Sequence, residues 1–177
     1  MCAIIIFKMI KKKNSKLFLS VVIPCYNEEA NLKRGVLRQV YDYLKKRKYS
    51  WEVIISDDGS TDKSKKLVET FVKKYPRFRL LKNQHGGKPY AVWQGIKRAR
   101  GEIVLFTDMD QSTPISEIKK LLPFFNKGYD VVIGSRGWRR KGAPFYRQIA
   151  GWIFLNSRRL FLLPNIVDTQ CGFKAFK

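Results

Sequence analysis

The chain contains few of the side chains from which disulfide networks and zinc sites are built. It has 3 cysteines, Cys2, Cys25 and Cys171, which are widely spaced and form no CxxC pair, and its only histidine is His85. An odd, scattered set of thiols with a single imidazole argues against a disulfide framework and against a zinc site. The motifs GxGxxG and GxxxxGKS/T are also missing, so the sequence gives no support to a dinucleotide-binding or P-loop protein.

Acidic residues are scarce as well. The 177 residues include 14 Asp and Glu against 36 Lys and Arg, which gives a formal net charge of +22. Such a charge predicts an anionic partner: phosphates, an acidic lipid surface or nucleic acid. Since no RRM, KH, helix-turn-helix or zinc-finger pattern accompanies it, we expect no nucleic-acid partner. Many of the lysines, such as those in Lys45–Lys48, fall on expected helix surfaces, where they serve solubility.

Long hydrophobic runs are the third absence. The first ten residues are apolar, but they are too short to span a bilayer and lack a signal-peptide cleavage site. We expect residues 1–16 to be an N-terminal extension that either lies on a membrane or is loosely packed. A hydrophobic content of 45% and the absence of repeats favour one folded domain over residues 17–177.

Apolar runs and helical patterns alternate along this domain. The order predicts an α/β fold with a doubly wound, mainly parallel sheet and helices on both faces. The loops that follow the strands then share one rim of the sheet, where α/β proteins bind ligands. The expected strands are 17–23, 51–56, 78–81, 102–107 and 130–134, and the expected helices are 28–46, 62–74, 89–98 and one opened by Pro114.

Two pairs of carboxylates fall on that rim. Asp108 and Asp110 follow a buried strand, where they can share a hard divalent cation with nucleotide phosphates; alternatively, they form a helix cap and a solvated turn. Asp57 and Asp58 follow another strand and can accept hydrogen bonds from a base or ribose. The alternative, that the carboxylates satisfy backbone N–H groups of the following turn, we expect mainly of Asp62.

Residues His85-Gly86-Gly87-Lys88 precede an expected helix. They offer flexible backbone and a cation to a phosphate at a helix N-terminus, although an ordinary glycine-rich turn explains the glycines equally well. We expect His85 to be a surface or hydrogen-bonding residue and not a catalyst.

Five segments of the domain form a recognisable combination: Val22–Glu29, Asp57–Asp62, Gly87-Lys88 with Ala91 and Gly95, Asp108–Asp110, and Gly134–Arg136. Taken together, these segments resemble the family 2 glycosyltransferases, enzymes of the Rossmann-like GT-A fold, from Leu19 to Phe176. The closing run Asp168–Phe176 is similar to the branch that uses polyprenyl phosphates, the dolichyl-phosphate β-glucosyltransferases in particular.

The resemblance implies roles for individual residues. It implies a Mg²⁺ or Mn²⁺ ion held by Asp110, with Asp108 beside it, and Asp108, Asp110 and Arg136 as the catalytic group. The nucleotide sugar would contact Pro24, Tyr26, Glu28, Asp57, Asp58, Lys88 and Asp108, and the acceptor phosphate would contact Arg136, Arg147 and Lys174. Pro89 stands where many relatives have a glycine, and it restricts the backbone after Lys88.

The activity implied is an inverting transfer of a hexose, with UDP-glucose as the expected donor, to a polyprenyl or dolichyl phosphate. Because family members continue beyond the closing run, we expect the C-terminal part of the glycosyltransferase domain to be missing from this sequence. The alternative to an active transferase is a catalytically inactive, membrane-associated relative or a fragment. Peripheral attachment to the cytoplasmic side of a membrane is expected through the basic, aromatic segment Gly137–Leu163, which otherwise is a core helix of the domain. The oligomeric state is left open.

Overall fold

The computed structural model describes residues 17–135 and 171–177. The expected N-terminal extension 1–16, the segment Gly137–Leu163 and the predicted site residues Arg136 and Arg147 lie outside the described residues.

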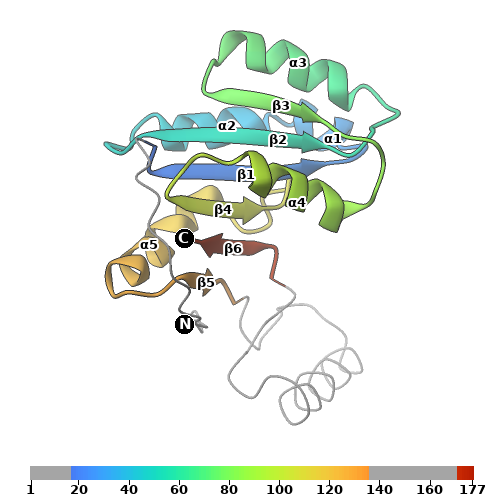
Figure 1. The fold of residues 1–177 in the computed structure, drawn as a ribbon. Helices are drawn as coiled ribbons and strands as arrows, with labels where there is room; N and C mark the ends of the chain where they lie inside the picture. The colour runs from blue at the N-terminus through green and yellow to red at the C-terminus, as the bar shows by residue number, and fades with distance from the viewer. Residues whose placement is uncertain (1–16, 136–170) are drawn as a thin grey trace, which may run out of the picture.

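A six-stranded sheet organises the described part of the chain (Figure 1). Its strand order is β3-β2-β1-β4-β6-β5. The pairs β1–β2, β1–β4 and β2–β3 are parallel, whereas β6 runs antiparallel to both β4 and β5. The strands are β1 Leu19–Cys25, β2 Trp51–Asp57, β3 Phe78–Lys82, β4 Ile103–Thr107, β5 Val131–Ile133 and β6 Phe173–Phe176.

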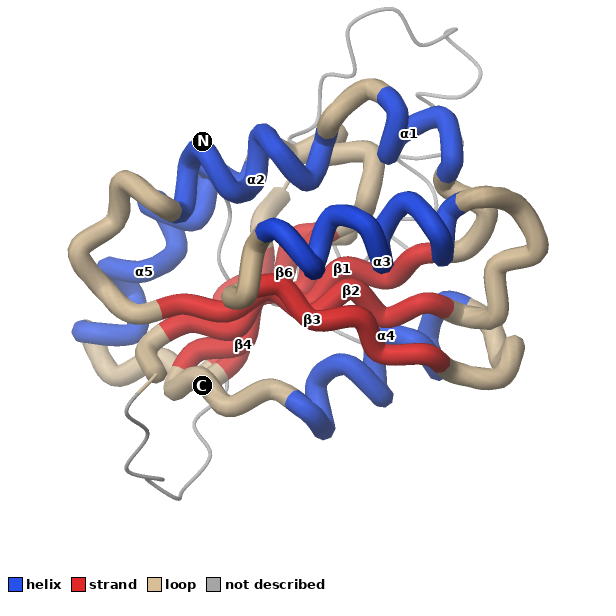
Figure 2. Tube along the Cα trace, turned by 90° about the horizontal axis from the view of Figure 1, so that it is seen from above, coloured by secondary structure: helices blue, strands red, loops and turns tan. Residues whose placement is uncertain are grey.

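Helices cover both faces of this sheet. Figure 2 places α4 on the side opposite α1, α2 and α3. The α/β class, the mainly parallel sheet and the helices on both faces are therefore confirmed. The helices are α1 Glu29–Lys33, α2 Val36–Leu44, α3 Ser64–Lys74, α4 Lys88–Arg98 and α5 Ile118–Asn126, with a 3₁₀ turn, η1, at Ile115–Glu117.

The core lies between the central strands and these helices. Every residue of β1 and β2 is buried, as their near-continuous apolar runs predict for parallel strands covered on both faces. On the α4 side, Ala91 and Gly95 are the buried residues of the helix. A Cβ added at Gly95 would overlap the Val22 side chain, so the absence of a side chain lets α4 lie close to β1.

Two local expectations were wrong. The helix expected over 28–46 is divided into α1 and α2, because Gly35 adopts a left-handed φ of +78° between them. The first strand, expected over 17–23, extends to Cys25, so Pro24 lies within β1, paired with Ser56. The β1–β4 ladder ends at Val22, so the missing N–H of Pro24 falls where β1 is paired on one side only.

The strand β6 was not predicted. It lies between β4 and β5, with Phe173 opposite Thr107 of β4. This register brings residues 171–173 beside the end of β4, where the Asp-Met-Asp sequence begins.

Candidate active site

A pocket of about 340 Å³ opens at the carboxyl ends of β1, β2 and β4. It brings together seven of the predicted site residues from distant parts of the chain. Asp57 and Lys174 are not among its lining residues, and their predicted roles stay predictions. The lining consists of Pro24, Cys25, Tyr26, Glu28, Asp58, His85, Gly87, Lys88, Ala91, Asp108, Met109 and Asp110.

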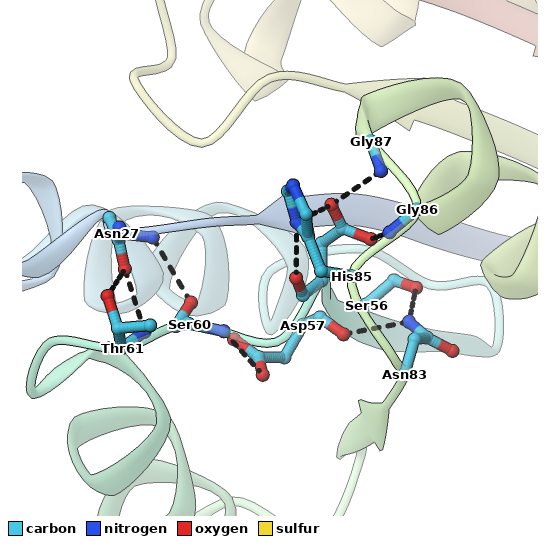
Figure 3. Close-up of polar contacts among 10 residues, drawn as sticks. Asn27, Ser56, Asp57, Ser60, Thr61, Asn83, His85, Gly86 and Gly87 are labelled. Carbon is cyan, nitrogen blue, oxygen red and sulfur yellow. Dashed lines mark hydrogen bonds and ion pairs between the residues drawn. The ribbon is translucent and has the colours of Figure 1, made fainter.

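Asn27 joins the loop after β1 to the loop after β2 (Figure 3). Its side-chain Oδ1 accepts hydrogen bonds from the backbone N–H groups of Thr61 at 2.9 Å and Asp62 at 3.3 Å, while its own N–H donates to Ser60 Oγ at 3.1 Å. Asn27 also has a positive φ of 53°, a conformation that Asn tolerates better than most residues. We therefore infer that Asn27 positions its neighbours Tyr26 and Glu28. The sequence did not predict this role, because it depends on contacts with residues 60–62.

Asp58 joins the loop after β2 to the start of α4. Its carboxylate is buried and accepts hydrogen bonds from the backbone N–H groups of Gly86 at 3.0 Å and Gly87 at 2.9 Å, both labelled in Figure 3. His85 Nδ1 lies 2.9 Å from Asp58 Oδ2 and 3.0 Å from the Asp58 carbonyl oxygen. The carboxylate thus fixes the loop from which Lys88 projects.

The turn role expected mainly of Asp62 is carried by Asp57, the last residue of β2. Asp57 Oδ2 accepts a hydrogen bond from the Ser60 N–H at 3.3 Å. Asp62 instead accepts from the N–H groups of Ser64 at 2.9 Å and Glu29 at 3.2 Å. Expecting this role of Asp62 and less of it from Asp57 was wrong, whereas the Asp58 carboxylate bonds the glycine loop and not this turn. Within the described part of the chain, the buried Asp57 Oδ1 has no hydrogen-bond partner.

Two aromatic rings form one wall of the pocket mouth. The rings of Tyr26 and His85 are stacked, with centroids 4.6 Å apart and planes inclined by 29°. The Tyr26 side chain remains 45% exposed, so a flat ligand ring has an aromatic surface against which to pack. The hydrogen-bonding role predicted for His85 is confirmed by its contacts with Asp58.

The two carboxylates after β4 also line the pocket. Met109 between them is buried, which anchors the turn by an apolar side chain. Lys88 Nζ lies 2.7 Å from Asp108 Oδ1. Asp110 Oδ1 accepts a hydrogen bond from the Ser112 N–H at 2.9 Å, as the turn alternative requires, and yet Asp110 is exposed and lines the pocket.

This donor set fits a hard divalent cation. Within residues 17–135 and 171–177, no three His, Cys, Asp or Glu side chains gather as a complete metal site. Asp108 and Asp110 contribute carboxylate oxygens, the ligands that Mg²⁺ and Mn²⁺ prefer, and phosphate oxygens of a ligand commonly complete such a shell. The pocket therefore suits a metal that arrives with a diphosphate.

Gly172 packs directly against Asp108. A Cβ added at Gly172 would overlap Asp108 Oδ2 and would lie 2.6 Å from Asp108 Cγ. The neighbouring Cys171 and Phe173 are both buried, so this backbone cannot retreat easily. The Asp108 carboxylate can therefore occupy its observed position only because residue 172 is a glycine.

Cys25 is expected to resist alkylation although it lines the pocket. Burial, followed by the negative charge of Asp57, raises the pKa of the Cys25 thiol to about 12. At pH 8 about one molecule in ten thousand then carries the reactive thiolate. Iodoacetamide treatment followed by peptide mass spectrometry should show Cys25 unlabelled in the native protein and labelled after unfolding. Rapid labelling of the native protein would contradict the burial of this thiol.

The comparisons with known proteins agree with this geometry. The model of the family described as "Glycosyl transferase family 2" matches residues 20–177. A dolichyl-phosphate beta-glucosyltransferase of Trichomonas vaginalis is 36% identical over 178 residues, covering 92% of this chain and 54% of the relative. The dolichyl-phosphate beta-glucosyltransferase of Saccharomyces cerevisiae is 35% identical over 186 residues, covering 92% of this chain and 55% of the relative. The chain thus spans about half the length of these curated relatives.

Among solved structures, a mannosyltransferase from Pyrobaculum calidifontis in complex with GDP-Man and Mn²⁺ has a TM-score of 0.62 at 22% identity. The match covers 94% of this chain and 48% of that protein, and it supports the GT-A fold. In the described residues, no helix has the length and apolar character needed to cross a membrane.

Proposed function

Because the chain belongs to glycosyl transferase family 2, we propose that it transfers a hexose from a nucleoside diphosphate to the phosphate of a polyprenyl or dolichyl lipid. The observation that carries this proposal is the pocket in which Tyr26, Asp58, Lys88, Asp108 and Asp110 converge from three strand ends. Relatives named as dolichyl-phosphate beta-glucosyltransferases support the lipid acceptor and glucose as the transferred sugar, and we propose UDP-glucose as the donor.

The donor binds along the pocket in this proposal. Its base packs on the Tyr26–His85 wall, and its diphosphate lies near Lys88, where the N-terminus of the 11-residue helix α4 adds a favourable dipole. Asp110 and Asp108 would hold the divalent metal, which when bound would supply positive charge to the leaving diphosphate. Lys88, released from Asp108, supplies a second cation to the diphosphate.

The acceptor supplies its own nucleophile. A lipid monophosphate has a second pKa of about 6, so at neutral pH its oxygen is largely dianionic and needs no general base. That oxygen forms a bond to the anomeric carbon while the bond from this carbon to the diphosphate oxygen breaks, which inverts the configuration. We place Arg136, Arg147 and Lys174 at the acceptor phosphate, with Arg136 also in the catalytic group, and we place the reaction at the cytoplasmic surface of a membrane.

The test is transfer by purified protein with Mn²⁺, polyprenyl phosphate and a panel of donors that includes UDP-glucose and GDP-mannose. We expect the highest rate with UDP-glucose, a product of inverted configuration, and a rate that rises as the acceptor phosphate loses its second proton. The matched control acceptor is the neutral polyprenol, which should give no product. A retained configuration or a preference for the alcohol would contradict the mechanism, and nucleotide binding without turnover by any donor would favour a catalytically inactive relative.

A further inference from the structure

Helix α4 exposes two large aromatic side chains, although its apolar residues Val92 and Ile96 are partly buried. The small residues Ala91 and Gly95 face the sheet, while Trp93 is 57% exposed and Tyr90 is 40% exposed. In the described residues, Tyr26 at the pocket mouth is the other exposed large hydrophobic side chain. Surface helices normally bury their large apolar residues, so α4 presents to solvent the part of its sequence best suited to a contact.

The same face is basic. Residues 90 and 93 are three positions apart and 93 and 97 are four apart, so Tyr90, Trp93 and Lys97 share one side of the helix. Lys97 Nζ lies 5.7 Å from the centroid of the Trp93 ring, and Arg98, the last residue of the helix, is also exposed. No acidic residue occurs between Lys88 and Arg98. We call Tyr90, Trp93 and Lys97, together with Arg98 at the end of the helix, the α4 outer face.

A second surface helix provides the contrast. In α3 the apolar Val68 is fully buried, and the exposed residues include Lys65, Lys66 and Lys73. Both helices are basic outside, but α4 adds two aromatic rings to its cations. Charge alone therefore does not distinguish the α4 outer face; the combination of exposed aromatic rings and cations does.

We propose that the α4 outer face docks on an anionic lipid bilayer. Tryptophan and tyrosine pack at the boundary between headgroups and acyl chains, and lysine and arginine attract acidic headgroups. A second copy of this chain is disfavoured as the occupant, since the contact would oppose two basic faces of a protein with a formal charge of +22. A bilayer supplies both the apolar layer and the negative charge that this face lacks.

Docking through the α4 outer face would bring the pocket next to the bilayer. Helix α4 begins at Lys88, which lines the pocket, and Figure 2 shows the helix on its own side of the sheet, away from α1, α2 and α3. A bilayer against α4 therefore lies beside the pocket and leaves the opposite layer of helices in solvent. The inference rests on the proposed function only in that a lipid acceptor makes such an approach useful.

Sedimentation with vesicles of phosphatidylcholine and phosphatidylserine tests the docking without donor or acceptor, so its failure is distinguishable from a failure of the transferase activity. We expect Tyr90→Ala with Trp93→Ala to lower the partition coefficient by about tenfold or more. Lys97→Glu with Arg98→Glu should lower it strongly, whereas Lys65→Glu with Lys66→Glu on α3, which changes the net charge equally, should have a much smaller effect. Circular dichroism should show every variant folded, because all six substituted side chains are exposed or partly exposed at the surface.

A second measurement locates the insertion. Brominated acyl chains should quench part of the tryptophan emission of the wild-type protein, and Trp93→Phe, which retains an aromatic ring, should remove that part while binding persists. Equal losses for the α3 and α4 charge reversals, unchanged partitioning of the Tyr90→Ala/Trp93→Ala variant, or unchanged quenching in Trp93→Phe would overturn the proposal. So would light scattering that shows a dimer dispersed by Trp93→Ala, since the occupant would then be a second copy.

Discussion

Asp110→Asn should remove most of the affinity for UDP that Mn²⁺ provides, a loss of about a hundredfold. The substitution replaces one anionic oxygen of a metal ligand by a neutral amide, while the remaining side-chain oxygen can still accept the hydrogen bond from the Ser112 N–H. The loop should therefore keep its shape. Calorimetric titration of UDP with and without Mn²⁺ measures the difference directly.

Asp42→Asn is the matched control for this experiment. Asp42 lies on α2, where it pairs with Arg38 and Lys45 at the surface, and it does not line the pocket. The control variant should bind UDP as the wild-type protein does, with and without metal. If UDP binding proves independent of metal and identical in both variants, Asp110 is not a metal ligand.

Gly172→Ala is expected to reduce turnover and metal-dependent UDP affinity by about a hundredfold, although residue 172 would contribute no chemical group. The new methyl group competes for the space of the Asp108 carboxylate, which must rotate away from its position beside Lys88. Steady-state kinetics and calorimetry measure the losses of turnover and of UDP affinity, and thermal unfolding measures the change in stability. We expect the losses of turnover and affinity to be larger than the change in stability explains.

Two comparisons separate positioning from general disruption. Gly134→Ala places a methyl group 3.2 Å from the Phe173 carbonyl oxygen, against the same strand but away from Asp108, and should leave UDP affinity nearly unchanged. In an Asp108→Ala background, Gly172→Ala should add little further loss, because the carboxylate that it displaces is already gone. Additive losses in that double variant would show that Gly172 does not act through Asp108.

The features predicted correctly from the sequence are those with local signals. Apolar runs of five to seven residues predicted β1, β2 and β4, and the acidic residues that follow them were predicted to meet at one rim. The pocket confirms that Asp58, Asp108 and Asp110 lie together. Parallel topology makes this inference reliable, since it sends successive strand ends to the same edge.

The features missed from the sequence depend on contacts between distant residues. The segment Phe-Lys-Ala-Phe of β6 is too short for apolar–polar alternation to identify a strand. It forms a strand because it pairs with both β4 and β5. The close packing of Gly172 against Asp108 joins residues 64 positions apart, and Asn27 acts through the loop 60–62. Hydrophobic periodicity does not reveal such pairings between distant residues. Pro24 is tolerated in β1 because the β1–β4 ladder ends at Val22, whereas the break at Gly35 depends on its own left-handed φ of +78°.

The insertion of β6 between β4 and β5 sets the order in which this sheet can be completed during synthesis on the ribosome. The parallel unit β1 to β4 contains its own partners, but β5 has β6 as its neighbour and cannot join the sheet until residue 176 has emerged. Until then β4 presents an unpaired edge, the kind of surface that invites intermolecular strand pairing. With this topology the loops after β1 and β2 can form before residues 171–173 pack beside Asp108, so we expect the acidic turn after β4 to be the last part of the pocket to become rigid.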